Sequence, residues 1–375
     1  MTHLERFTHV MEYQPVDRVP NWEVGVWPQT VERWEHEGLD RRLLHWDWFT
    51  GEEYFGLDPR EYIPVNLGML PPFPTEVLAR TDRYEIVRNG NGIVTKALIE
   101  GTVNGGRMCM DQYLSFPVET LADFEALKNR YIAGQAARYE PGWRDFRVAG
   151  WKNRQHVLVL GRNCSTLGFY WRGREWMGTE NLSYAWYDDP PLCDAMMEFV
   201  ADFTIETLRP VLDEVAPDYV FINEDMAMKS GPLLSPDTYR RYIQPHMRRL
   251  VDFLKGKGVR YVVVDSDGDT EPLIPLLLEC GVDGLWPIER ASDQMDPVAL
   301  RKKYGRALRL WGAVDKRCIA AGPAAIDAHL RSLVPLIEDG GFIPTVDHTV
   351  PPDISLSHFR YYMQQKQKLL AGQAF

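Results

Sequence analysis

The sequence predicts an α/β protein built as a distorted (β/α)8 barrel of the TIM type, with an irregular, hairpin-containing insertion in its N-terminal part. From about residue 156 onward, short apolar segments alternate with helical segments, as in a parallel sheet made of right-handed βα units. No glycine-rich nucleotide-binding turn follows any of these segments, so a closed barrel is favoured over an open sheet. No convincing linker interrupts the chain, and we expect residues 1–375 to form one domain.

The predicted strands are short, apolar and followed by polar residues, and amphipathic helical segments separate them. RVPNWEVGVW is the earliest strand and is needed to bring the count close to that of a closed barrel. The expected strands lie within residues 18–27, 156–163, 219–225, 259–265, 281–289, 307–316 and 340–348, and the expected helices at about 190–214, 235–258, 271–281, 295–304 and 323–337.

The helix predicted at 235–258 carries start and stop signals. Ser235 is placed as its N-cap, Pro236 occupies the first helical position and Gly258 follows its last turn. Pro245 inside this segment has no N–H to donate, so we expect it to kink or split the helix.

The N-terminal third does not follow the βα rhythm. Residues 84–110, YEIVRNGNGIVTKALIEGTVNGGRMCM, contain Asn-Gly pairs between alternating segments, a pattern typical of β-hairpins. We expect this region to form an insertion over the barrel mouth.

Composition excludes several classes of protein. The chain has 45% hydrophobic and 25% charged residues and no run of about 18 apolar residues, so no membrane span is expected. The N-terminus is charged where a signal peptide would be apolar, which predicts a cytoplasmic protein. A formal net charge of −11 argues against a nucleic-acid partner. The five cysteines form no CxxC pair, which argues against a zinc knuckle or a disulfide framework.

Acidic and basic side chains follow several predicted strands directly. In a parallel barrel these strand ends meet at one mouth, where the chemistry of such barrels takes place. Carboxylates crowded there must protonate, separate or share a cation, and with a histidine nearby a divalent metal is the simplest solution. The residues concerned are Asn223, Glu224, Asp225, Asp265, Asp267, Asp269, Glu289, Asp315, Lys316, Asp347 and His348.

Each of these residues also has a purely structural interpretation. An aspartate after a strand is often a helix cap or a turn residue, and Asp269 fits that role because it directly precedes the helix near Glu271. The DSDGD stretch does not fit an EF-hand, since the twelfth position counted from Asp265 is Leu276 instead of an acid.

Several long motifs, in the same order, resemble the uroporphyrinogen decarboxylase-like superfamily, which implies the same barrel. They are ERFTHVMEYQPVDRVPNWE (5–23), NEDMAMKSGPLLSPDTYRRYIQP (223–245), DSDGD (265–269), GAVDKRCIAAGPAAID (312–327) and PTVDHTVPPDISLSHFRYY (344–362).

The resemblance extends to two branches with different chemistry. Uroporphyrinogen decarboxylases grip their substrate's carboxylates with an arginine-rich segment near the first strand, where this chain has Trp22–Trp27 with no arginine and one acid, Glu23. That acid would repel a substrate with many carboxylates. The other branch comprises methyltransferases that exchange methyl groups with a corrinoid, and its coenzyme M-type members hold zinc with His-x-Cys and a later Cys. Asp265, Asp267 and His348 stand at those positions here.

The methyltransferase branch implies a set of roles. Glu224, Asp267 and His348 are the expected zinc ligands, with Asp265 as a fourth or supporting group. Asp225, Lys229 and Glu289 would orient ligands or supply a proton. Oxygen and imidazole ligands make zinc a stronger Lewis acid than thiolates do, which suits an oxygen leaving group. The expected reaction is therefore demethylation of a methyl ether by the Co(I) form of a corrinoid.

Substrate and partner follow from the same reasoning. Aromatic residues near strand ends would suit a methoxylated benzene ring, although ordinary barrel packing or cover for the mouth insertion explains them as well or better. The expected pocket residues are Trp22, Glu23, Trp27, Phe169, Tyr170 and Trp286. The chain lacks an Asp-x-His-x-x-Gly cobalt-ligating motif, so a separate corrinoid-binding protein is expected to supply the cofactor. A metal-independent decarboxylase and a non-catalytic accessory protein remain the alternatives.

Overall fold

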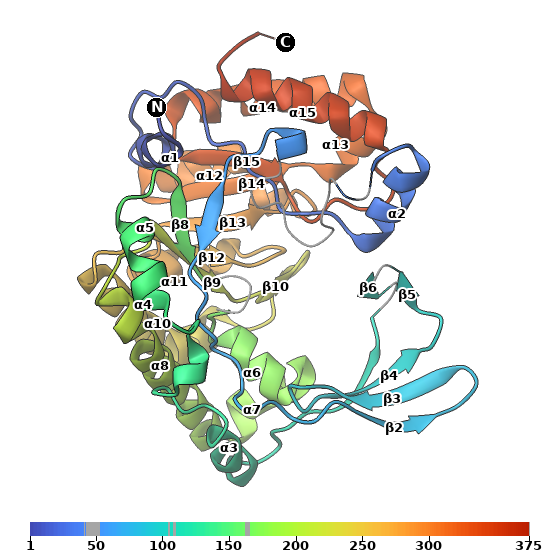
Figure 1. The fold of residues 1–375 in the computed structure, drawn as a ribbon, viewed down its shortest axis with the longest axis vertical. Helices are drawn as coiled ribbons and strands as arrows, with labels where there is room; N and C mark the ends of the chain where they lie inside the picture. The colour runs from blue at the N-terminus through green and yellow to red at the C-terminus, as the bar shows by residue number, and fades with distance from the viewer. Residues whose placement is uncertain (41, 43–52, 104–105, 108–109, 162–165, 375) are drawn as a thin grey trace.

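A curled, fully parallel sheet of seven strands forms the centre of the molecule (Figure 1). The computed structural model describes residues 1–40, 42, 53–103, 106–107, 110–161 and 166–374. Among the strands that alternate with helices, every predicted one is present, so the barrel prediction is confirmed. In spatial order the strands are β1 (Arg60–Tyr62), β8 (Val157–Leu160), β9 (Tyr219–Asn223), β12 (Tyr261–Asp265), β13 (Gly284–Ile288), β14 (Arg309–Val314) and β15 (Phe342–Val346).

The prediction of a regular strand at 18–27 is wrong. This segment forms only one isolated bridge, between Val26 and Val350, although it runs beside the chain that follows β15. Pro20 has no N–H to donate, and Gly25 has a φ of 141°, so the backbone cannot sustain a ladder. β1 takes an edge position of the sheet, and its polar sequence REY gave no strand signal.

Helices follow the strands in the expected order and lie outside the sheet (Figure 1). Outward-facing strand residues such as Val220 and Ile222 pack with them in the larger hydrophobic cluster. The helices are α1 (His3–Met11), α2 (Pro28–His36), α3 (Leu121–Lys128), α4 (Trp143–Phe146), α5 (Val148–Lys152), α6 (Tyr170–Met177), α7 (Thr179–Asp188), α8 (Pro190–Leu212), α9 (Pro236–Thr238), α10 (Gln244–Gly256), α11 (Ile274–Glu279), α12 (Pro297–Tyr304), α13 (Lys316–Ala321), α14 (Pro323–Asp339) and α15 (Leu356–Leu370).

The predicted helix at 235–258 is split as expected. Ser235 caps α9 through a bond from the Thr238 N–H, and a π-helical segment, Tyr239–Ile243, separates α9 from α10. Pro245 is the second residue of α10, where its missing N–H interrupts the regular ladder.

The hairpin prediction is confirmed as an arm that projects from the barrel (Figure 1). Its four antiparallel strands are β2 (Glu76–Arg80), β3 (Tyr84–Arg88), β4 (Val94–Leu98) and β7 (Gln112–Ser115). Asn89 forms the turn between β3 and β4, because its Oδ1 accepts the N–H groups of Asn91 and Ile93. A small pair, β5 (Thr102–Val103) and β6 (Gly106–Arg107), lies beyond the arm, and β5 contacts α2.

Inward-facing residues fill the barrel at its N-terminal end. Tyr219 and Phe221 of β9 point inward, in alternation with the outward valine and isoleucine, and belong to a second hydrophobic cluster. Phe7 of α1 lies 5.6 Å from Tyr219 and 6.1 Å from Trp311 between ring centroids, so α1 closes this end. Along the described residues, no helix has the length and apolar character needed to cross a bilayer.

Candidate active site

The loops at the C-terminal ends of the strands meet, as the barrel geometry predicts. Asn223 and Asp265 continue the inward alternation of β9 and β12 and are paired in register. The next loop residues are tied across strands, since the Glu224 N–H donates to the Asp265 carbonyl at 2.8 Å and the Ser266 N–H to the Trp286 carbonyl at 3.0 Å. The mouth is therefore a set of interlocked loops on a rigid sheet.

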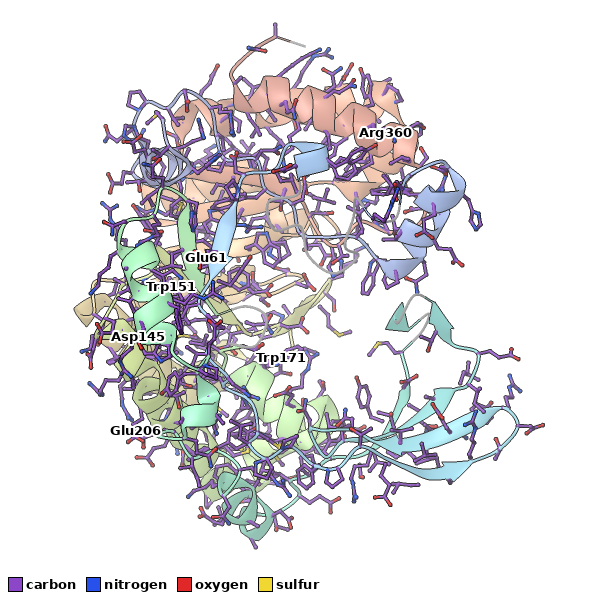
Figure 2. The ribbon with its side chains drawn as sticks, viewed as in Figure 1. Glu61, Asp145, Trp151, Trp171, Glu206 and Arg360 are labelled. Atoms are coloured by element: carbon purple, nitrogen blue, oxygen red, sulfur yellow. The ribbon has the colours of Figure 1, made fainter. Side chains whose placement is uncertain are left out.

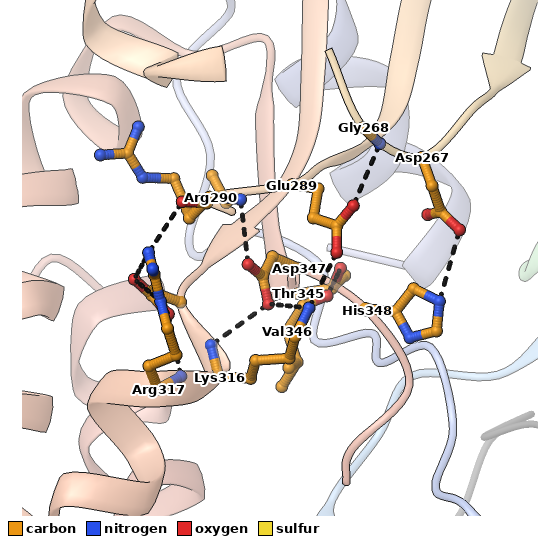
Figure 3. A network of polar contacts seen from close by, with 12 residues as sticks. Asp267, Gly268, Glu289, Arg290, Lys316, Arg317, Thr345, Val346, Asp347 and His348 are labelled. Atoms are coloured by element: carbon orange, nitrogen blue, oxygen red, sulfur yellow. Dashed lines mark hydrogen bonds and ion pairs between the residues drawn. The ribbon is translucent and has the colours of Figure 1, made fainter. Parts of the chain in front are cut away.

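Asp267 and His348 make the contact that the sequence predicted between two distant segments. Asp267 Oδ2 lies 3.3 Å from His348 Nε2 (Figure 3). Both side chains are about one-third exposed. Burial opposes protonation of the imidazole, but the hydrogen bond and charge of Asp267 outweigh it and raise the pKa of His348. Trp27 stacks on the imidazole at 6.0 Å between ring centroids and 23° between planes.

Gly268 explains why the DSDGD motif needs a glycine. Its φ is +74°, and a Cβ at this position would lie 2.6 Å from the carbonyl carbon of Met228. The Asp269 N–H donates to the Met228 carbonyl, and Asp269 Oδ1 accepts the Glu271 N–H at 3.1 Å. Asp269 therefore stabilises the turn that leads into the helix at Glu271, which is one of the two structural roles that its position suggested.

A partly buried ion-pair network fixes the loops around this pair (Figure 3). Glu289 accepts the Gly268 N–H at 3.0 Å and the Lys316 ammonium at 2.9 Å. Lys316 also lies 3.6 Å from Asp347, which is 1% exposed and accepts the Arg290 N–H. Burial alone would lower the pKa of Lys316, but the surrounding carboxylates raise it, so the ammonium stays charged. Glu289 thus joins the loops after β12, β13 and β14.

Asp225 is held close to the same pair by an arginine. Arg174 of α6 contacts the Asp225 carboxylate at 2.9 Å and its carbonyl oxygen at 2.8 Å. Asp225 has a φ of 42°, a conformation that aspartate tolerates better than most residues. Burial raises the pKa of Asp225, Arg174 lowers it, and Asp267 and His348 act on it as well. Arg174 was not predicted; its only sequence signal is its place one helical turn after Tyr170.

Glu224 does not face the site, which corrects the expected ligand set. Its carboxylate is fully buried and accepts the N–H groups of Phe169 at 2.9 Å and Tyr170 at 2.7 Å. These N–H groups stand at the start of α6, where no intrahelical partner exists for them. Burial raises the pKa of Glu224 to about 7, although the backbone hydrogen bonds oppose the shift. Glu224 therefore caps a helix.

Trp22 and Glu23 do not line a pocket either, and both are 2% exposed. Trp22 packs on Phe7 and Trp311 at the closed end of the barrel, with centroids 5.5 and 5.7 Å away. Glu23 pairs with the buried ammonium of Lys366 at 2.6 Å. Since Glu23 is neutralised in the core, the argument that it would repel an acidic substrate fails.

The other predicted residues divide between the core and the rim. Phe169 and Tyr170 are fully buried. Trp286 points into the barrel against Phe221, 5.1 Å away between centroids, and is 6% exposed. Lys229 is exposed on the turn between the short strands β10 (Ala227–Met228) and β11 (Gly231–Pro232). Of the predicted pocket residues, Trp27 is the one in contact with the Asp267–His348 pair.

Two of the four expected zinc ligands are in contact. The 3.3 Å between Asp267 and His348 is close to the separation of two donors on a tetrahedral zinc ion with bonds of about 2.0–2.2 Å. Glu224 is engaged elsewhere, and within the described part of the chain no three His, Cys, Asp or Glu side chains are grouped to hold a metal ion. The Asp267–His348 pair therefore fits zinc as a partial site, whereas the full predicted set does not.

The chain is similar to known proteins both in sequence and in structure. The profile of the family described as "Uroporphyrinogen decarboxylase (URO-D)" matches residues 164–369. Uroporphyrinogen decarboxylase of Nocardia farcinica is 29% identical over 44% of this chain, and that of Thermus thermophilus is 28% identical over 37%. These alignments span 46% and 39% of the two relatives, so less than half of either is matched.

A methyltransferase from Methanosarcina mazei has a similar structure, with a TM-score of 0.59 and 14% identity over 98% of this chain and 99% of that one. At this identity the likeness concerns the fold alone. The family match covers more than half of the chain and includes the loops that carry Asp225, Asp267 and His348. The chain therefore belongs to the uroporphyrinogen decarboxylase (URO-D) family of enzymes.

Proposed function

We propose that this protein is a methyltransferase that takes the methyl group from a methoxylated aromatic substrate and passes it to the Co(I) corrinoid of a separate protein. The observation that carries the proposal is the contact between Asp267 and His348 at 3.3 Å at the barrel mouth. These residues stand where the resemblance to coenzyme M-type methyltransferases places metal ligands. The structure of the Methanosarcina mazei methyltransferase adds only that a methyltransferase can be built on this fold.

The residues of the site would prepare the ether oxygen for departure. In the proposed transfer the Co(I) corrinoid, as the methyl acceptor, would supply the electron pair of the new bond to carbon and so become Co(III). The methyl carbon–oxygen bond would break with its own electron pair left on the oxygen, which would leave as a phenolate. Asp267 and His348 would hold Zn²⁺ beside that oxygen, and the ion would supply Lewis acidity. Trp27 restricts the orientation of the imidazole, and Glu289 and Lys316 keep the loop of Asp267 in place.

Decarboxylation of a porphyrinogen receives no support from the segment Trp22–Trp27, which contains no arginine. A porphyrinogen with many carboxylates needs several cationic contacts.

The proposal is tested with free cob(I)alamin as the methyl acceptor and a panel of methoxyaromatic compounds. We expect the cob(I)alamin absorbance to convert to that of methylcobalamin when the protein and a suitable methoxyaromatic are both present, and elemental analysis to find about one zinc per chain. Absence of conversion across the panel by folded, zinc-loaded protein would reject methyl-ether demethylation. Full activity in metal-free protein would reject the role of zinc.

A further inference from the structure

A hollow lies between the arm and helices α6 and α7. Its volume is about 600 Å³, which falls in the range of small-molecule sites. Tyr113 and Phe116 line it from the arm, and Trp171 and Arg174 line it from α6. Because α6 follows β8, its first turn stands on the mouth side of the barrel, and Trp171 lies at that end of the helix (Figure 2).

Aromatic rings form the walls of this cavity. Tyr113 and Phe116 stack with centroids 5.5 Å apart and 20° between planes. Phe116 packs against Gly178, where a Cβ would approach its ring to 2.3 Å, so the arm is seated closely on the joint between α6 and α7. Flat apolar walls of this kind suit a planar ring.

Arg174 connects the cavity to the candidate active site. One terminal nitrogen, Nη1, binds Asp225, whose N–H donates to the Asp265 carbonyl at 3.1 Å, two residues before Asp267. Within the described part of the chain, Arg174 forms its hydrogen bonds through Nη1, and its Nε and Nη2 form none. The guanidinium lies 5.2 Å from the ring centroid of Trp171, and the side chain is 27% exposed. Its free edge can therefore form the paired bonds that a carboxylate accepts.

The acidic residues around the cavity leave room for an anion at Arg174. Glu175 is neutralised by Arg172 at 2.5 Å and also accepts a bond from Asn91. Glu119 and Glu180 are exposed, so water and salt screen their charges.

We infer that this cavity binds an aromatic carboxylate, with the ring against Trp171 and the carboxylate on the free edge of Arg174. The methoxy group of this ligand rests on the proposed function, which is methyl transfer from a methoxylated aromatic compound. The cavity narrows the substrate class of that function to methoxybenzoates. In this pose the methoxy end of the ring would lie toward the mouth, where Asp225 is hydrogen-bonded to the Asp265 carbonyl in the segment that leads to Asp267.

The test compares the binding of 4-methoxybenzoate and 4-methoxybenzyl alcohol by calorimetry, without corrinoid. These ligands share the methoxylated ring and differ in charge. Wild-type protein should bind the acid at least about 10-fold more tightly than the alcohol, and the preference should shrink as salt is raised. Arg174→Gln should abolish the preference while changing the affinity for the alcohol little. Trp171→Ala should weaken both ligands alike.

The matched control is Arg241→Gln, which removes an arginine from another ion pair, that with Asp194, outside the cavity. It should keep the full preference. Equal affinity of the wild-type protein for acid and alcohol, which needs no variant to measure, would overturn the inference, as would a preference that survives Arg174→Gln. Because binding is measured without methyl transfer, an intact preference in protein that methylates no cobalamin would count against the proposed function alone.

Discussion

Two acidic residues that follow neighbouring strands have opposite roles here. Asp267 follows β12 and faces His348 across the mouth, whereas Glu224 follows β9 and turns back to cap α6. Both positions looked alike in the sequence, because each is a carboxylate within two residues of the end of an apolar strand. The direction of a side chain after a strand depends on the backbone of the turn, as the positive φ of Asp225 illustrates. Such a turn is not encoded in the strand pattern.

The buried carboxylate of Glu224 should make stability depend on pH. Its pKa is raised from 4.5 to about 7, so between these values the folded protein keeps a proton that the unfolded chain has lost. The free energy of unfolding should therefore fall as pH rises from about 4.5 to 7, by about 3 kcal/mol from this group. In Glu224→Gln that part of the decline should vanish.

Denaturant unfolding at pH 5, 6 and 7.5 measures the effect in both proteins. All other titrating groups are common to the two, so the difference between their pH profiles isolates Glu224. If the unfolding free energies of wild type and Glu224→Gln change with pH in parallel, the pKa of Glu224 is not raised by burial in the folded protein.

At the scale of elements, the periodicity of the sequence was the reliable guide. Alternating apolar strands and capped helices were predicted correctly because burial enforces both patterns. The predictions for segment 18–27 and for β1 were wrong because local burial patterns do not determine these two segments. Their conformation is fixed by contacts with residues far away in the sequence. Val26 bridges to Val350, and the polar β1 pairs with β8.

Replacement of Gly268 should disrupt the conformation of the loop after β12. In Gly268→Ala the new Cβ meets the Met228 backbone, and the residue is held at a left-handed φ. We expect a loss of about 2 kcal/mol or more in stability and at least a 10-fold loss of turnover, because the loop carries Asp267. Gly38→Ala is the control, since Gly38 has a φ of +93° but open space around it. Similar effects in the two variants would show that close packing of Gly268 is unimportant.

At the scale of the whole molecule, the barrel is closed by an irregular segment held through a buried ion pair. Glu23 accepts bonds from Lys366 and Tyr362 of α15, and from the Val346 N–H of β15. The N-terminal segment, the last strand and the last helix are thereby tied together. The aspartate–histidine convergence was predictable because barrel topology sets where strand ends meet. The arginine of α6 and the shape of the cavity were not, since they depend on how the arm packs.

Removal of Lys366 tests this closure. Lys366→Met should lower the free energy of unfolding by about 3–5 kcal/mol, because Glu23 is left charged and fully buried. The double variant Lys366→Met with Glu23→Gln should recover much of the loss, since no unpaired charge remains. Thermal and denaturant unfolding of the three proteins provide the measurement. If the double variant loses as much unfolding free energy as the two single substitutions added together, Glu23 and Lys366 do not stabilise the protein as an ion pair.

The central claim is that Asp267 and His348 act together in methyl transfer. The most direct measurement is the rate of cob(I)alamin methylation by wild-type protein, Asp267→Ala, His348→Ala and the double variant, with Asp123→Ala and His36→Ala as controls outside the mouth. We expect each site variant to lose about 100-fold or more, the double variant to lose no more than the worse single one, and the controls to stay near wild type. Near-normal turnover in either folded site variant, or losses that multiply in the double variant, would contradict the account.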